Sequence, residues 1–182
     1  MKKNTALKAL CKVLLSSRKQ IYVQRADGCT YICDGVTLMR IRAEIDAKTL
    51  KESTGIDETA PYICNRRQLR DIWEQHEPCP GTLPAEILPV CYLYHVGRAD
   101  LAVQYIRTHS GDALAVDRDY ITAIERTISY YVTPGRTPDT IYVNTADGWD
   151  AIILTVQLSP AQHAAVATAA AAIETALNWA AK

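Results

Sequence analysis

The sequence contains no phenylalanine, and its formal net charge is zero because 20 basic side chains match 20 acidic ones. A neutral chain has no overall attraction to nucleic acids or to membrane surfaces, so binding of either kind would need local clusters of charge. Tyrosine, with ten copies, is the main aromatic residue. A tyrosine on a strand can pack its ring while its hydroxyl stays in water, which suits half-buried sheets.

Long apolar runs are missing as well. No stretch approaches the roughly 18 apolar residues that cross a bilayer, and the N-terminal segment has neither the apolar centre nor the cleavage pattern of a signal peptide. We therefore expect a cytoplasmic protein with no membrane partner. Hydrophobic residues make up 48% of the chain and charged residues 22%, which is enough apolar material for a folded core.

Recognisable metal and catalytic motifs are absent. The six cysteines form no CxxC pair, and no histidine lies at zinc-finger spacing. Without a secretion signal, a disulfide framework is not expected either, so we predict that the cysteines are buried small apolar side chains. The sequence also lacks a glycine-rich phosphate loop and any familiar catalytic signature. We expect no metal and no cofactor, and an enzyme is the least favoured class.

The chain does contain an internal similarity. The segment IYVQRADG at 21–28 recurs as IYVNTADG at 141–148, with six of eight residues identical. Each copy is a short alternating apolar run that ends in Asp-Gly, the pair typical of a tight hairpin turn. Because each copy also follows a helical-looking segment, the pattern predicts repeats of a helix-then-hairpin unit. Turn geometry also explains Asp27, Asp34 and Asp147, each of which precedes a glycine.

Periodicity and capping patterns place the expected elements. The predicted helices cover residues 5–16, 66–76, 118–131 and 159–180. The predicted strands cover residues 20–26, 29–33, 36–42, 90–96, 101–107, 112–116, 139–146 and 149–158. Asn65 would cap the second helix, Asp117 the third and Ser159 the last. Residues 44–60 are expected to form a short strand or a turn of helix with a loop, and 77–89 a proline-rich loop.

Tight hairpins join most of these strands, which makes the pairing mainly antiparallel. The predicted fold class is therefore α+β, an antiparallel sheet with helices on one face. We expect one domain, 1–182, built from pseudo-repeat units at about 1–60, 61–111 and 112–158 and a C-terminal helix over 159–182.

Three segments carry a family resemblance. They are residues 5–41, which include the turn YICDGVTL at 31–38, the extended-then-helical segment YICNRRQL at 62–69, and the strand-to-helix junction LAVDRDYI at 114–121. Together they resemble the DNA sliding-clamp fold, in which a helix and a three-stranded meander repeat, with sheets outside and helices facing a central hole. Bacterial clamp chains are much longer, and neither the alanine-rich C-terminal helix nor the proline-rich stretch at 78–89 has a clear counterpart in them.

The first basic candidates are Lys8 and Lys12, which fall outside the apolar stripe of helix 5–16. With Lys2, Lys3, Arg18 and Lys19 they give the first nineteen residues six basic side chains and no acid. The clamp resemblance implies that such a helix meets DNA phosphates. The alternative is an ordinary solvated polar face.

Arg66, Arg67 and Arg70 form the second basic candidate. The first turn of a helix prefers acids because its free N–H groups carry partial positive charge, so arginines there concentrate positive potential where anions already bind well. A phosphate contact is one interpretation. The alternative is pairing with Asp71, with Glu74 or with the acidic loop at 44–58.

These patterns favour a non-enzymatic, DNA-associated, clamp-like or protein-interaction module that contacts phosphates without reading sequence. Lys8, Lys12, Arg66, Arg67 and Arg70 would then have to lie on one continuous surface. A structural or oligomeric subunit with no nucleic-acid role remains open, and so does a small enzyme without a familiar motif. The possible partners are thus the DNA backbone, a second copy of the chain or another protein, and the small-residue C-terminal helix could pack on either of the latter two.

Overall fold

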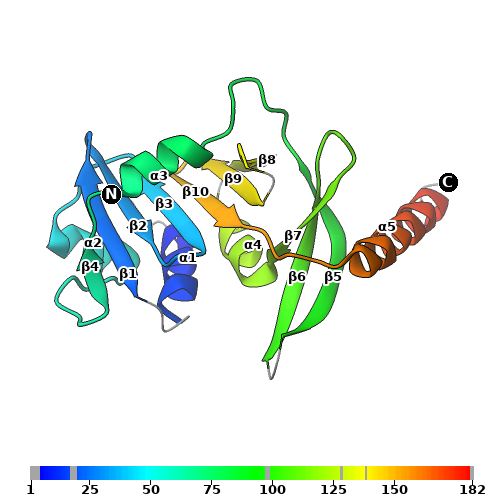
Figure 1. The fold of residues 1–182 in the computed structure, drawn as a ribbon, viewed down its shortest axis with the longest axis horizontal. Coiled ribbons are helices and arrows are strands. Elements are labelled where there is room, and N and C mark those ends of the chain that lie inside the picture. The colour runs from blue at the N-terminus through cyan, green and yellow to red at the C-terminus, as the bar shows by residue number, and fades with distance from the viewer. Residues whose placement is uncertain (1–4, 17–19, 97–98, 128, 138, 181–182) are drawn as a thin grey trace.

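The computed structural model describes residues 5–16, 20–96, 99–127, 129–137 and 139–180 (Figure 1). The elements in chain order are α1 (Thr5–Ser16), β1 (Ile21–Ala26), β2 (Cys29–Cys33), β3 (Thr37–Ile41), α2 (Ala47–Thr54), β4 (Ile63–Asn65), α3 (Leu69–His76), β5 (Glu86–Val96), β6 (Ala99–Arg107), β7 (Ala113–Asp117), α4 (Arg118–Ile124), β8 (Tyr130–Pro134), β9 (Thr140–Thr145), β10 (Trp149–Leu154) and α5 (Pro160–Ala180).

The strands form two sheets. The larger has seven strands in the order β4-β1-β2-β3-β10-β9-β8, and the smaller has the order β5-β6-β7. Two antiparallel meanders, β1–β3 and β8–β10, join through their last strands, because β3 pairs with β10 in antiparallel register. Among the described strands only β4 pairs in parallel, alongside β1. The α+β class and its mainly antiparallel pairing are confirmed.

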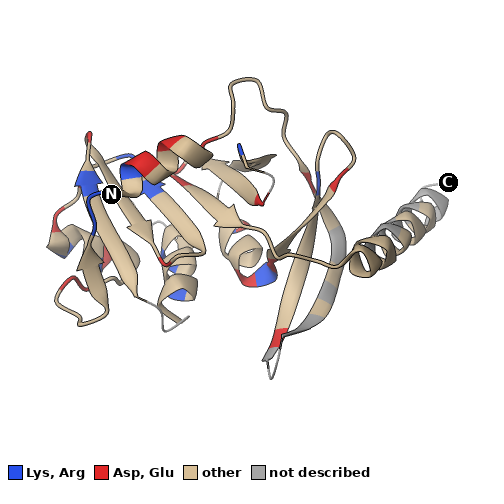
Figure 2. Cartoon of the chain, in the orientation of Figure 1, with Lys and Arg blue, Asp and Glu red and all other residues tan. Residues whose placement is uncertain are grey.

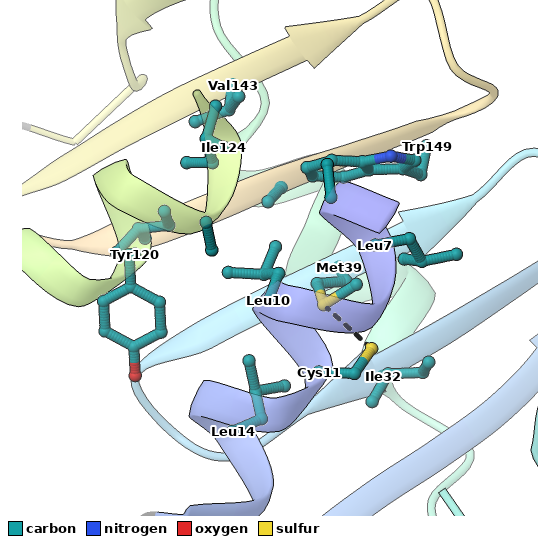
Figure 3. Packing of buried hydrophobic residues seen from close by; sticks show 14 of the residues in the cluster. Leu7, Leu10, Cys11, Leu14, Ile32, Met39, Tyr120, Ile124, Val143 and Trp149 are labelled. Carbon is teal, nitrogen blue, oxygen red and sulfur yellow. Dashed lines mark hydrogen bonds between the residues drawn. The ribbon is translucent and has the colours of Figure 1, made fainter. Parts of the chain in front are cut away.

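Two helices, α1 and α4, cover one face of the seven-stranded sheet (Figures 1 and 3). Leu7, Leu10 and Leu14 recur at helical spacing on α1 and are all buried against the strands. Cys11 shares this stripe, and its sulfur lies 4.0 Å from that of Met39 on β3. Burial of these apolar side chains between helix and sheet is the main favourable contribution to the free energy of folding. α4 packs beside α1 and also against β6 and β7, which joins the smaller sheet to the same core.

The opposite face of the large sheet is covered by α3. Leu69 and Trp73 from this helix are buried against Tyr31 and Tyr142, which point away from α1 and α4. Side chains alternate between the two faces of a strand, and here both sets are apolar, so both faces need cover. The expectation that the helices gather on one face is therefore wrong.

The start of α3 also differs from the prediction. The helix begins at Leu69, while Asn65 belongs to β4 and does not cap it. Instead Gln24 on β1 accepts a hydrogen bond from the Arg70 backbone N–H at 2.9 Å and donates one to the Arg67 carbonyl, also at 2.9 Å. A side chain distant in sequence thus satisfies a helix terminus that the local sequence leaves open.

The helix predicted over 118–131 is shorter than expected. α4 ends at Ile124, and β8 begins at Tyr130. The apolar residues after the helix are used to pair with β9, so tertiary pairing overrides the helical pattern. The predicted cap at Asp117 is confirmed, since its side chain accepts from the Asp119 N–H at 2.9 Å.

Other local predictions agree with the structure. α1 spans its predicted range, and the strands expected over the first meander form β1, β2 and β3. The Ser159 and Gln162 side chains make the reciprocal bonds of a capping box at the start of α5. Residues 44–60 contain the two-turn helix α2, more than the single turn expected. The side chains of the stripe predicted for α5 (Val166, Ile173 and Leu177) lie outside the described residues, as do Gly97 and Arg98 in the β5–β6 turn.

The repeated octapeptides form two hairpins, β1–β2 and β9–β10, that lie on either side of β3. Asp27 and Gly28 adopt positive φ angles of 51° and 70°, as a tight Asp-Gly turn requires. The second copy follows β8 and not a helix directly, so the two copies differ in their place within a meander. The pseudo-repeat units and the single-domain boundary stay predictions.

The cysteines divide by exposure. All six are free, and only Cys11 is buried, while Cys29, Cys33 and Cys64 are partly buried. Cys79 and Cys91 are exposed, so the prediction of uniformly buried cysteines is wrong for these two. Both lie in segments that run along the edge of a sheet or beside it, where a side chain can point to solvent. In the described part of the chain, no helix has the length and apolar character needed to cross a membrane.

Candidate functional site

The outer surface of α1 and α4 is one candidate interface, which we call the two-helix face. Its core-facing stripes are apolar, which leaves polar side chains on the outside. Lys8 and Lys12 of α1 are exposed, and so are Arg118 of α4 and Arg126 just beyond it. Figure 2 shows basic positions on both helices. The cations of two segments distant in sequence therefore share one side of the sheet.

A groove of about 300 Å³ runs between the two helices. Its polar lining comprises Lys12 and Ser16 from α1 and Asp119, Thr122 and Arg126 from the α4 segment. Two cations and two hydroxyl groups thus line the same groove, next to a single carboxylate. Hydroxyl donors and basic side chains are the groups that proteins commonly use to contact phosphate oxygens.

The cations of the two-helix face are not neutralised within the described structure. Across residues 5–16, 20–96, 99–127, 129–137 and 139–180, no ion pair or hydrogen bond involves the side chains of Lys8, Lys12, Arg118 or Arg126. The α4 segment also carries two exposed acids, Asp119 and Glu125, and α1 carries none, so across both segments the four cations outnumber the two exposed acids. The basic residues at positions 2, 3, 18 and 19 lie outside the described residues.

The second predicted cluster lies on the other side of the sheet. Arg66 places its guanidinium 4.6 Å from the centre of the Tyr22 ring, and Tyr22 packs with the apolar cluster under α3. Arg66 and Arg67 are exposed and precede α3, so they do not occupy its first turn. The five predicted residues therefore do not form one continuous surface: Lys8 and Lys12 are separated from the arginines by the sheet.

Arg70 has a structural role. Its guanidinium pairs with Asp27 at 2.9 Å, with Asp71 at 3.2 Å and with Glu74 at 3.5 Å. The bond with Asp27, with the nearby charges of Glu74 and Asp71, raises the pKa of Arg70 further. The interpretation that it pairs with Asp71 and Glu74 is confirmed, and three carboxylates leave it little net positive charge for a phosphate.

Two acids of the 44–58 loop pair with other basic side chains. Asp57 pairs with Lys51 at 2.6 Å, and Glu58 pairs with Arg25 at 2.8 Å. Neither acid contacts the arginines that precede α3, so that version of the pairing hypothesis is not supported in the described residues.

Asp34 confirms the turn interpretation of the Asp-Gly pairs. Its carboxylate accepts hydrogen bonds from the backbone N–H groups of Val36 at 2.9 Å and Thr37 at 2.7 Å. The Tyr120 hydroxyl lies 3.5 Å from its other oxygen, which links α4 to this turn. Burial and the Asp34 carboxylate raise the pKa of Tyr120, so the phenol stays protonated. The contacts of Asp34 thus stabilise the turn between β2 and β3 and connect it to α4.

The described residues contain no group of three or more His, Cys, Asp or Glu side chains placed to hold a metal ion. His76, His109 and His163 lie on different elements, and the side chain of His95 is outside the described set. His76 forms a 3.1 Å hydrogen bond with the Thr137 hydroxyl, which connects the end of α3 to the β8–β9 turn.

Sequence reasoning missed Arg118 and Arg126. Both fall outside the apolar stripe of their predicted helix, which is the same signal that identified Lys8 and Lys12. Their relevance depends on α4 packing next to α1, and no local pattern predicts that neighbour.

No protein-family model, curated protein or solved structure matches the chain.

Proposed function

We propose that this protein is a non-enzymatic, DNA-associated module whose two-helix face contacts the phosphate backbone without reading base sequence. One observation carries the proposal: Lys12 and Arg126 line one groove from two segments, Lys8 and Arg118 are exposed on the same two helices, and none of the four pairs with a described residue. Cations that form no internal pairs keep their full charge for an external anion. Phosphate contacts of this kind position a protein on a duplex and supply most of its non-specific affinity.

The arrangement of the helices supports a clamp-like form of this proposal. α1 and α4 lie side by side on one face, and the strands of both meanders form a continuous sheet behind them. In the fold that the sequence resembles, helices of this kind face the DNA. Arg66 and Arg67, on the far side of the sheet, have no part in such a contact.

A second candidate is an oligomeric or protein-interaction subunit, and α5 favours it. This helix spans 21 residues and extends from the body of the protein (Figure 1). Most of its described side chains are exposed alanines and threonines. Light scattering of the full chain tests this candidate: a stable oligomer would support it, and a monomer would contradict an oligomeric subunit. The same measurement bears on the clamp-like form, because one pair of helices cannot enclose a duplex alone, so a monomer would restrict DNA binding to an open face.

Charge removal tests the DNA contact. We expect the double variant Lys8→Gln/Lys12→Gln to bind a fluorescently labelled duplex on the order of tenfold more weakly than the unchanged protein at low salt, because two phosphate contacts are lost. The loss should be equal for duplexes of unrelated sequence. Fluorescence anisotropy measures both affinities, and the long polar glutamine keeps the helix propensity of the site.

The matched control is Arg66→Gln/Arg67→Gln, which removes the same charge from the opposite side of the sheet. We expect this variant to retain nearly all of its affinity. Equal weakening in both variants would show that net charge, not the two-helix face, controls binding. If the unchanged protein fails to bind any duplex at low salt, the proposal is wrong.

A further inference from the structure

A second cleft, of about 440 Å³, lies on the α3 side of the large sheet, away from the two-helix face. Its floor comes from β8 and β9, where Tyr131 lies opposite Asn144 and Thr133 opposite Tyr142. These four residues share one face because side chains two apart on a strand point the same way. The facing wall is the loop 77–82, and Arg136 in the β8–β9 turn also lines the cleft. The volume is in the range of small-molecule sites.

The floor of this cleft is held in place by neighbouring side chains on the same face of the sheet. The ring of Tyr142 meets Trp73 edge to face at 5.9 Å, and Trp73 meets Tyr31 in the same way at 6.2 Å. The Arg40 guanidinium lies 4.4 Å from the centre of the Trp73 ring on this face. Asn144 donates a 3.2 Å hydrogen bond to the Tyr142 hydroxyl, which fixes the amide. Because the aromatic contacts and this hydrogen bond already restrict the side chains of the floor, ligand binding costs little further conformational entropy there.

The facing loop is also ordered by its own bonds. The Thr82 N–H donates to the Cys79 carbonyl at 3.2 Å, across Pro80 and Gly81. Gly81 has a φ of 84°, which is the geometry of a type II turn with proline before glycine. The Ala85 N–H then donates to the Val132 carbonyl at 2.7 Å and fastens the end of the loop to the edge of β8. Both walls are therefore formed before any ligand arrives.

The polar and aromatic groups that line the cleft differ in what they offer a ligand. The Thr133 residue is only 3% exposed, and its hydroxyl has no hydrogen-bond partner among the described residues. This oxygen is almost inaccessible, so it is not open to a ligand in the cleft. The exposed Arg136 uses one guanidinium nitrogen to donate to the Glu74 carbonyl at 3.2 Å, which leaves its other N–H groups for an anion. The Tyr131 residue is 49% exposed.

We propose that this cleft binds a nucleotide. An exposed tyrosine ring is a stacking platform for a base, an asparagine amide can hydrogen-bond the base edge, and a guanidinium binds phosphate. Tyr131, Asn144 and Arg136 provide these three functions around one cavity. A free mononucleotide and an unpaired nucleotide of a strand share this chemistry. The site is independent of the two-helix face, because the sheet separates them.

Cysteine alkylation offers a direct test, since the exposed Cys79 lines the cleft and the exposed Cys91 on β5 does not. We expect adenosine 5′-monophosphate to slow the reaction of Cys79 with iodoacetamide at least about threefold and to leave Cys91 unchanged, because a filled site blocks access. Adenosine should protect less than the monophosphate. Peptide mass spectrometry follows both thiols in one sample.

Single substitutions test which part of the nucleotide each residue contacts. Arg136→Gln should remove the advantage of the monophosphate over adenosine, and Tyr131→Ala should weaken protection by both. Lys12→Gln, on the other side of the sheet, is the control. The nucleotide should protect Cys79 in this variant as well as in the unchanged protein, whatever the effect of the substitution on duplex binding.

The source of the nucleotide follows from a comparison of the monophosphate with a five-nucleotide adenine strand. Whichever protects Cys79 at the lower concentration identifies the natural form, and protection by either supports the proposal. Protection by neither overturns it, and so does equal protection of Cys79 and Cys91. Protection by inorganic phosphate as strong as that by the monophosphate also overturns it, because the base would then contribute nothing.

Discussion

Asp150 on β10 shows how a single buried residue joins the two halves of the large sheet. It is fully buried, and its carboxylate accepts from Arg40 at 2.9 Å and from Arg42 at 2.9 Å, both from the β3 side. The same Arg40 lies over Trp73 and is 3.4 Å from Glu77. One carboxylate therefore holds two cations at the junction of the meanders, next to the floor of the proposed nucleotide cleft.

Replacing this carboxylate tests its importance. We expect Asp150→Asn to lower the free energy of unfolding by about 3 kcal/mol, because it removes the fully buried carboxylate to which both Arg40 and Arg42 donate. Urea denaturation followed by circular dichroism measures the change. The exposed Asp139→Asn serves as the control, with an effect within about 0.5 kcal/mol. A loss for Asp150→Asn no larger than that of the control would contradict this role.

At the scale of single elements, the predictable features are local ones. The stripe of α1 and the Asp-Gly turns are fixed by residues close in sequence, and both were predicted with nearly correct boundaries. The start of α3 was not, because the Gln24 side chain that completes its terminus lies 46 positions before Arg70. The end of α4 was also not predicted, because the chain after it forms β8, which pairs with β9. Long-range partners thus explain the misplaced boundaries.

The junction after α2 gives a pH-dependent prediction. The Lys51 ammonium and the hydroxyl and N–H of Thr59 lower the pKa of Asp57 to about 2, and so tie the end of α2 to the next loop. A carboxylate with a lowered pKa in the folded state stabilises the fold above its unfolded pKa of about 3.9 and loses that contribution as the pH falls toward 2.

We therefore expect Asp57→Asn to be less stable than the unchanged protein near pH 7. The difference between their free energies of unfolding, the stability gap, should close as the pH falls from about 4 to about 2. Because Lys51 is 62% exposed, salt should also reduce the gap. Urea midpoints measured for both proteins across this pH range test the prediction. A gap that stays constant, or that widens in acid, would show that the ion pair does not act through ionised Asp57.

At the scale of the whole molecule, the sequence identified basic side chains but not their relative positions. Lys8 and Lys12 could be placed on the outside of α1 from spacing alone. That Arg66 and Arg67 lie across the sheet, and that Arg126 joins Lys12 at one groove, follows from the order of the strands and from helix packing. The proposed nucleotide cleft depends on contacts between β8, β9 and the proline-rich loop, which the sequence indicated only as separate pieces.

The salt dependence of duplex binding tests the central proposal most directly. A plot of log affinity against log salt concentration has a slope of about −0.9 for each phosphate neutralised. Four cations on the two-helix face predict a slope of about −3 to −4 for the unchanged protein, and Lys12→Gln should reduce its magnitude by about 1. A slope near zero, or one that Lys12→Gln leaves unchanged while Arg66→Gln reduces it, would contradict a DNA contact through α1 and α4.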